Sequence, residues 1–203
     1  MFTGIIKHLG EIRAVRSEGT NRVFDMFTSF DEAIHVDQSI SHDGVCLTVE
    51  SILEEQDGGT LYSLTAVEET LTKTSLEQWE LGRVVNVELC LQAGARLDGH
   101  FVQGHVDTTG TVRRVELRDG SWLFEFRFDP KHRNLVVDRG SICVNGVSLT
   151  VVDAMEDGFT VTIIPFTYEH TSFRSLKEGD TVNLEFDILG KYMLRIMESR
   201  LVS

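Results

Sequence analysis

The chain consists of two related halves, and this internal repeat constrains its fold more than any other feature. Three blocks recur in the same order: residues 42–49 (HDGVCLTV) as residues 144–151 (VNGVSLTV), residues 85–89 (VNVEL) as residues 182–186 (VNLEF), and residues 10–13 (GEIR) as residues 110–113 (GTVR). The separation between the copies stays between 97 and 102 residues. Three blocks in register indicate a duplication followed by small insertions and deletions.

The repeat places a domain boundary near residues 94–99 (GARLDG), a glycine-bearing stretch suited to a linker. Each half then has about 95 residues, enough for a domain with its own core. We therefore expect a first domain over residues 1–97, a second over residues 98–188, and a C-terminal extension over residues 189–203.

Within each half the hydrophobic pattern is that of β-strands. Val85, Val87 and Leu89 alternate with Asn86 and Glu88, and the second copy repeats this alternation. A period of two with one apolar face is typical of an antiparallel strand that is buried on one side only. Many short strands predict an all-β fold of two small, closed or nearly closed barrels.

A few segments favour helices instead of strands. Short helices are expected around residues 74–79 and 171–176, just before a glycine turn in each copy. Residues 192–201 also predict a helix, with an apolar stripe of Met193, Leu194, Met197 and Leu201. A lone stripe on a terminal helix needs a partner, and self-association is the simplest one.

The composition excludes several classes of protein. The net charge is −13, whereas nucleic acids and anionic membranes select for clustered Lys and Arg. The three cysteines are odd in number and far apart, which favours neither a disulfide framework nor a zinc site. Without a signal peptide or an apolar run of about 18 residues, we expect a cytoplasmic protein that does not cross a membrane.

Polar residues recur at matching positions in the two copies. Cys46 and Thr48 share one strand face, opposite Leu47, and Ser148 and Thr150 share the corresponding face of the second copy. If the apolar residues fill the barrels, these side chains point outward. They are then either merely solvated or form two equivalent binding surfaces, and their match between the copies favours binding. Cys46 opposite Ser148 is the main asymmetry, although a free cysteine commonly serves packing alone.

His105 follows Gly104, at the position that Ile5 occupies after Gly4. An imidazole beside a glycine is a candidate acid or base, and the alternative is an ordinary surface histidine. The chain has no HExxH metal motif, nucleophile elbow, dinucleotide fingerprint or P-loop, so we expect no metal and no cofactor.

Several of these segments together resemble riboflavin synthase. They are MFTGII at the N-terminus, GVCLTV at residues 44–49, GHFVQGHVD at residues 99–107, GVSLTV at residues 146–151 and GKY at residues 190–192. The resemblance implies two six-stranded antiparallel Greek-key barrels and a C-terminal helix that assembles three chains. It implies dismutation of two 6,7-dimethyl-8-ribityllumazine molecules to riboflavin and 5-amino-6-(D-ribitylamino)uracil, between barrels of neighbouring subunits. Association with lumazine synthase remains open.

The resemblance also implies the site residues. The positions linked to catalysis are Ser39, Cys46, His105, Ser148, Thr150 and Asp187. The positions that would contact ligand are Gly4, Ile5, Ile6, Cys46, Leu47, Thr48, Thr65, Ala66, Val67, Glu68, Glu69, Thr70, Gly104, His105, Val106, Arg139, Ser148, Leu149, Thr150, Ile163, Ile164, Pro165, Phe166, Thr167 and Tyr168. Of these, the N-terminal site is expected to be lined by Gly4, Ile5, Ile6, Cys46, Leu47, Thr48, Ala66 and Val67. The positions expected to contact ligand from the other copy or across the interface are Gly104, His105, Arg139, Ser148, Leu149, Thr150, Ile164 and Thr167.

Two positions depart from the family pattern, and two other functions compete. Arg139 stands where many members have Lys, and Asn145 where several have Asp, which puts a role as base at that position in doubt. The main alternative is a non-catalytic lumazine- or flavin-binding antenna protein on the same fold, and Cys46, His105 and Ser148 favour the enzyme. A plain interaction barrel would not need matched polar positions in both copies.

Overall fold

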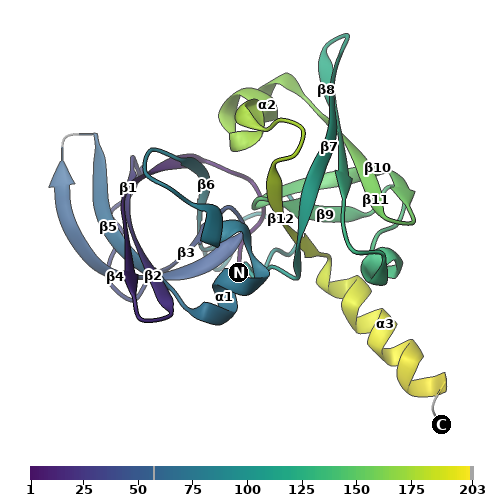
Figure 1. The fold of residues 1–203 in the computed structure, drawn as a ribbon, viewed down its shortest axis with the longest axis horizontal. Coiled ribbons are helices and arrows are strands. Elements are labelled where there is room, and N and C mark those ends of the chain that lie inside the picture. The colour runs from purple at the N-terminus through teal and green to yellow at the C-terminus, as the bar shows by residue number, and fades with distance from the viewer. Residues whose placement is uncertain (57, 202–203) are drawn as a thin grey trace.

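The computed structural model describes residues 1–56 and 58–201. It contains two closed antiparallel barrels of six strands each and a C-terminal helix, which confirms the predicted fold class. Figure 1 shows the barrels side by side, with helix α3 (Ile188–Leu201) pointing away from both. None of the helices in the described part of the chain is long and apolar enough to cross a membrane.

The two barrels have the same topology. The first follows the order β1-β2-β5-β4-β3-β6, and the second follows the equivalent order β7-β8-β11-β10-β9-β12 around the closed sheet. The first is built from β1 (His8–Glu18), β2 (Asn21–Thr28), β3 (Ser39–His42), β4 (Val45–Gln56), β5 (Gly59–Ala66) and β6 (Val84–Leu89). The second is built from β7 (Thr108–Arg118), β8 (Ser121–Arg127), β9 (Ser141–Val144), β10 (Val147–Met155), β11 (Gly158–Ile163) and β12 (Thr181–Phe186).

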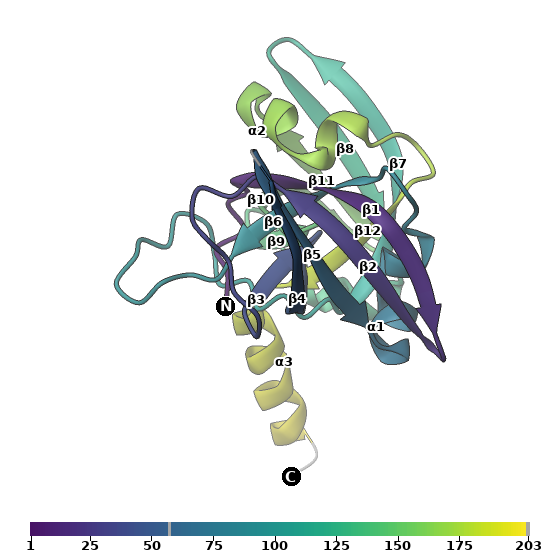
Figure 2. The same ribbon diagram turned by 90° about the vertical axis from the view of Figure 1, so that its left-hand side faces the viewer.

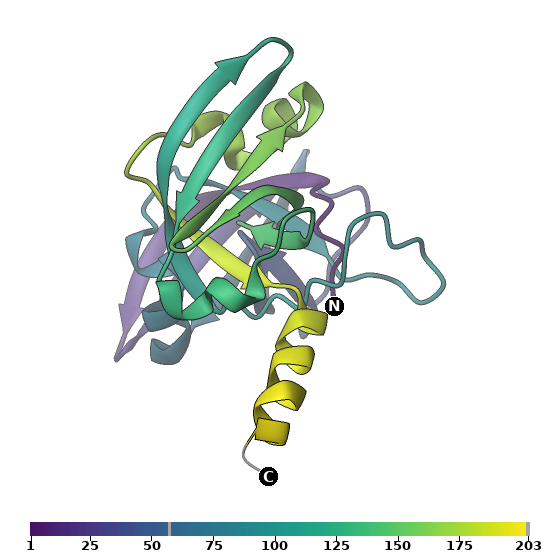
Figure 3. The ribbon, with the colours of Figure 1, turned by 90° about the vertical axis from the view of Figure 1, so that its right-hand side faces the viewer.

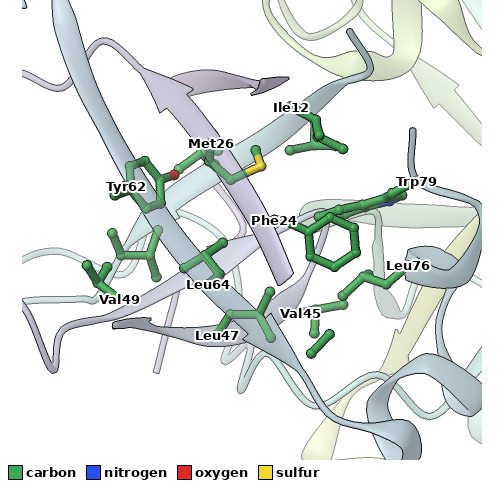
Figure 4. Packing of buried hydrophobic residues seen from close by; sticks show 14 of the residues in the cluster. Ile12, Phe24, Met26, Val45, Leu47, Val49, Tyr62, Leu64, Leu76 and Trp79 are labelled. Atoms are coloured by element: carbon green, nitrogen blue, oxygen red, sulfur yellow. The ribbon is translucent and has the colours of Figure 1, made fainter. Parts of the chain in front are cut away.

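Each barrel encloses its own hydrophobic core. In the first, Phe24 is fully buried and meets Trp79 edge to face, with ring centroids 5.2 Å apart. Figure 4 shows Trp79 and Leu76 beside Phe24, so the segment after β5 closes that end of the barrel. In the second, Phe173 of the equivalent segment packs against Phe124, with ring centroids 5.1 Å apart. The repeated sequence thus closes one end of both barrels in the same way.

The helical segments are longer than the sequence predicts. At the expected positions lie the 3-10 helices η1 (Ser75–Gln78) and η3 (Ser172–Ser175), capped by the side chains of Thr74 and Thr171. Each follows a short α-helix that the prediction missed, α1 (Glu68–Lys73) and α2 (Pro165–His170). Six residues are too few to show a helical period. A further 3-10 helix, η2 (Pro130–Leu135), lies between β8 and β9.

The prediction that β6 and its repeat are buried on one side only was wrong. Asn86 and Asn183 are each 1% exposed, and Glu88 and Glu185 are 6% and 2% exposed. Residues of the other half cover the two asparagines, and the first residues of each glutamate's own half cover that glutamate. Alternation reveals which face enters the barrel core, but it does not reveal that a second surface covers the opposite face.

The two halves meet in a pseudosymmetric polar junction. Asn86 donates its amide to the Asn145 carbonyl at 2.8 Å, and Asn183 donates to the Asp43 carbonyl at 2.9 Å. The side-chain oxygens of Asn86 and Asn183 in turn each accept a hydrogen bond at 2.7 Å from the backbone N–H of the other half's 3-10 helix. The repeated asparagines therefore join the barrels, which gives them a reason to match.

The first residues of each half also cross to the other half. Phe2 and Val102 form an antiparallel bridge, with N–H···O distances of 2.7 and 3.1 Å. We call residues 2–6 the first strap and residues 102–106 the second strap. Ile6 packs against the core of the second barrel, and Val106 packs against the core of the first. Each strap therefore begins in one half of the chain and packs against the barrel of the other half.

Helix α3 begins four residues before the predicted one. Figure 2 and Figure 3 show it extending away from the barrels in both side views. Met193 and Met197 of the predicted stripe are 66% and 64% exposed, whereas Leu194 is half-buried. The Leu201 side chain lies outside the described residues.

Candidate functional site

The second strap lies directly on β4 of the first barrel. Cys46 donates its backbone N–H to the Gly104 carbonyl at 2.9 Å. Gly104 has φ +80°, and a Cβ there would lie 2.6 Å from the Cys46 Cβ, so only glycine allows this approach. His105 follows with an exposed side chain. We call residues 46–48 with this strap the Cys46 site.

The first strap lies in the same way on β10 of the second barrel. Ser148 donates its N–H to the Gly4 carbonyl at 2.8 Å, and a Cβ on Gly4 would lie 2.6 Å from the Ser148 Cβ. We call residues 148–150 with this strap the Ser148 site. The expected grouping of Gly4, Ile5 and Ile6 with residues 46–48 is therefore wrong. Each strap serves the barrel of the other half because the straps cross at the Phe2–Val102 bridge.

The strand parity predicted for both sites is confirmed. Leu47 is buried in the barrel while Thr48 is exposed and Cys46 half-buried. In the second copy Ser148 is half-buried and Thr150 exposed, with Val151 beneath them in the core. Neighbouring strands complete the two surfaces. Ser39 lies opposite Thr48 on β3.

The ends of β5 and β11 supply the next residues of each site. Because Val49 pairs with Leu64, the last residues of β5 lie beside residues 46–48, and the chain then turns into α1. Val151 pairs with Val161, so Ile163 reaches the Ser148 site before α2 begins. The ends of β5 and β11 therefore run toward the Cys46 site and the Ser148 site, and α1 and α2 follow them. Val67, Ile164 and Phe166 are 51%, 58% and 66% exposed, which leaves apolar surface open beside both sites.

A histidine that the sequence did not single out contacts Ser148. His100 Nδ1 lies 2.7 Å from Ser148 Oγ, and the His100 side chain is largely buried. Burial lowers the pKa of His100, and the negative charge of Asp187 opposes that shift. His100 is therefore neutral near pH 7 and can accept or donate one proton at Ser148. His100 thus contacts Ser148 directly and lies within electrostatic reach of Asp187.

Cys46 differs from Ser148 in its electrostatics. Burial raises the pKa of the Cys46 thiol above its usual value. The thiol is therefore protonated near neutral pH, which favours a polar contact over a thiolate nucleophile. All three cysteines are free, and Cys143 is buried in a small cluster with Phe2 and Val102.

Two buried glutamates hold the straps. Glu88 on β6 accepts hydrogen bonds from the Thr3 N–H at 2.7 Å, the Thr3 hydroxyl at 2.7 Å and the Gly4 N–H at 2.9 Å. Glu185 on β12 accepts from the N–H groups of Gln103, Gly104 and His105 at 2.6, 2.9 and 2.8 Å. Burial raises the pKa of both carboxyls, and these donors oppose the shift because they favour the ionised form.

Comparison with known proteins agrees with this geometry. The family model described as "Lumazine binding domain" matches twice, over residues 3–90 and 103–187. Riboflavin synthase of Actinobacillus pleuropneumoniae is 37% identical over 95% of this chain and 88% of that protein. Riboflavin synthase of Bacillus subtilis is 36% identical over 97% of this chain and 90% of that protein. The chain belongs to the riboflavin synthase family.

Among solved structures, the riboflavin synthase fold of this chain is similar to that of LumP. A crystal structure of LumP complexed with riboflavin matches with a TM-score of 0.82 and 19% identity, covering 92% of this chain and 99% of that one. A second, complexed with 6,7-dimethyl-8-(1'-D-ribityl) lumazine, matches with a TM-score of 0.78 and 18% identity. At this identity the likeness supports the fold alone.

The two departures from the riboflavin synthase pattern lie in different places. Arg139 is exposed just before β9, and its N–H donates to the Val151 carbonyl at 2.9 Å, beside the Ser148 site. Asn145 is 1% exposed in the junction between the barrels, where its side-chain oxygen accepts the Asn183 N–H at 2.7 Å. Asn145 is thus a junction residue without access to either site.

His100, Glu88 and Glu185 are the functional candidates that the sequence reasoning missed. The glutamates occupy matched positions of the repeat, so their identity in both copies was the available signal. Their alternation with apolar residues suggested a solvated face instead. His100 has no such signal, because the first half contributes no residue in the repeat to compare with it.

Proposed function

We propose that this protein is a riboflavin synthase that converts two 6,7-dimethyl-8-ribityllumazine molecules into riboflavin and 5-amino-6-(D-ribitylamino)uracil. One lumazine gives up a four-carbon unit and the other receives it, so atoms and electrons balance without another reactant. The observation that carries the proposal is the duplicated site, in which one strand-and-strap arrangement occurs twice with different polar side chains. A reaction of two identical molecules in different roles needs such a pair.

The reaction requires a mild base and the correct orientation of two rings, and it does not require a strong base. The C7 methyl of the lumazine is acidic because its anion delocalises into the ring system. Holding two rings face to face removes most of the entropic barrier of a bimolecular step. Backbone groups at the strand edges can hold the ring carbonyls. We assign proton handling at one ring to Ser148 with His100, and contact with the other ring to Cys46, Thr48 and His105.

The two sites belong to different barrels, and both open outward beside exposed apolar residues. We propose that a Cys46 site and a Ser148 site from neighbouring chains face each other in a homotrimer held by α3. Leu189, Tyr192 and Ile196 are more than half exposed on this helix, which supports such a contact. Val67 and Phe166 would then contact the ligands or the neighbouring chain.

The test is to mix the purified protein with 6,7-dimethyl-8-ribityllumazine alone. We expect riboflavin absorbance and fluorescence to grow while the lumazine is consumed at two molecules per riboflavin. Ser148→Ala serves as the control, and we expect it to retain the fold and lose most of the turnover. Binding of the lumazine without turnover would instead identify a lumazine- or flavin-binding antenna protein.

A further inference from the structure

Each barrel's ligand site depends on a carboxylate that belongs to the other barrel. Glu185 lies on β12 of the second barrel, yet the strap that it holds forms the Cys46 site of the first. Glu88 lies on β6 of the first barrel, and its strap forms the Ser148 site of the second. We propose that Glu88 and Glu185 are positioning residues, each of which sets the geometry of the site in the opposite barrel. This inference rests on the proposed function only for its ligand.

The hydrogen bonds explain why a carboxylate is required. Three donors converge on each glutamate, and the two carboxylate oxygens offer only lone pairs to them. A glutamine of the same shape would turn an NH₂ group toward at least one backbone N–H. The strap would lose that bond and leave a buried donor unpaired.

Each strap also contacts the strand of the opposite barrel, so the position of the strap affects the residues of that site. The carbonyl of the held glycine accepts the N–H of Cys46 or Ser148, the side chains that differ between the sites. The glycines are also so close that a Cβ on either would lie 2.6 Å from the Cβ of Cys46 or Ser148. A strap that shifts by a fraction of an ångström therefore uncovers or crowds the residue beneath it.

The first test uses the thiol of Cys46 as a reporter, in a Cys90→Ser background because Cys143 is buried. We expect Glu185→Gln to speed labelling of Cys46 by a disulfide reagent at least about tenfold, since a lost hydrogen bond to a charged acceptor is worth that factor. Glu88→Gln is the matched control, because it removes the equivalent carboxylate but should leave the Cys46 rate unchanged. Equal acceleration by both variants, or by neither, would overturn the proposal.

The second test measures riboflavin affinity in the two sites separately. Thr150→Trp blocks the Ser148 site, and in that background we expect Glu185→Gln to weaken riboflavin binding about tenfold while Glu88→Gln does not. Thr48→Trp blocks the Cys46 site, and there the two effects should exchange. If each glutamine instead weakens the site in its own barrel, the proposal is wrong.

Two further measurements keep the outcome decisive. If Glu185→Gln fails to fold, Gly104→Ala moves the same strap by steric conflict and should also speed Cys46 labelling. If the unsubstituted protein binds no riboflavin and turns over no lumazine, the proposed function fails, whereas the labelling rates still decide whether the glutamates hold the straps.

Discussion

At the residue scale, the contact between His100 and Ser148 makes the Ser148 site chemically distinct. A buried imidazole 2.7 Å from a hydroxyl can take its proton or give one back. Burial raises the pKa of the Cys46 thiol, so the two sites differ in the polar group that they present. The repeat alone would predict two equal sites. Cys46 in one site, and Ser148 with His100 in the other, make them unequal.

We expect His100→Asn to lower turnover of lumazine about 100-fold, because asparagine keeps a polar contact near Ser148 but cannot exchange a proton. The pH profile separates this role from a structural one. Turnover of the unsubstituted protein should fall as the pH drops through the pKa of His100, which burial holds below its usual 6.5. In the variant this acid limb should disappear. An identical profile in both proteins, with equal thermal stability, would show that His100 only packs.

At the scale of elements, helix α3 extends away from the barrels, and among the described residues Lys191 ties its start to Asp107. A helix of 14 residues is marginal in water without a packing partner, and this one points away from both barrels. Five apolar side chains among its described residues are more than half exposed: Leu189, Tyr192, Met193, Ile196 and Met197. Such a surface is expected to pack against copies of itself.

If α3 holds the proposed homotrimer, replacing both Met193 and Met197 by Glu should convert it to single chains, as measured by light scattering. The expected cause is burial of two charges at an apolar contact. Arg195→Glu is the matched control, since it changes the charge of the helix by the same amount from an exposed position on the other side. An assembly that survives the double substitution would place the contact elsewhere on the chain.

The secondary-structure elements also show which parts of the fold the sequence pattern can predict. The repeat, the strand parity of residues 46–49 and the terminal helix could all be predicted, because each is a local periodicity or a match between copies. The exchange of the straps could not, because it is set by which surfaces meet after the barrels have formed. Glu88 and Glu185 look solvated in a strand pattern for the same reason, and His100 meets Ser148 across 48 residues of sequence.

At the scale of the whole molecule, the junction between the barrels is nearly symmetric, but its two halves differ at Asp43 and Asn145. Asp43 and Asn145 occupy equivalent positions, with φ values of +44° and +46°, and each accepts a backbone N–H from the last strand of its barrel. Both are buried, but only one is ionisable. Asp43 Oδ2 has no hydrogen-bond partner within the described residues and lies 3.9 Å from Arg83 Nη2.

Burial raises the pKa of Asp43 to about 7, against the attraction of Arg83. The folded protein therefore keeps a proton that the unfolded chain releases near pH 4. The stability linked to that proton is complete below the unfolded pKa and is lost as the pH rises toward 7. His42 acts in the opposite direction, because burial lowers its pKa to about 3, so the pH dependence of the whole protein mixes the two effects.

Replacing Asp43 by Asn isolates the junction, since it copies the residue that the second half already has and leaves His42 unchanged. We expect the variant to gain on the order of 2 kcal/mol of unfolding free energy over the unsubstituted protein at pH 8, and little at pH 4. Thermal unfolding across this range measures the difference. Asn145→Asp should do the reverse and lose stability as the pH rises. A gain that does not depend on pH would mean that Asp43 stays ionised in the folded junction, with Arg83 as a sufficient partner.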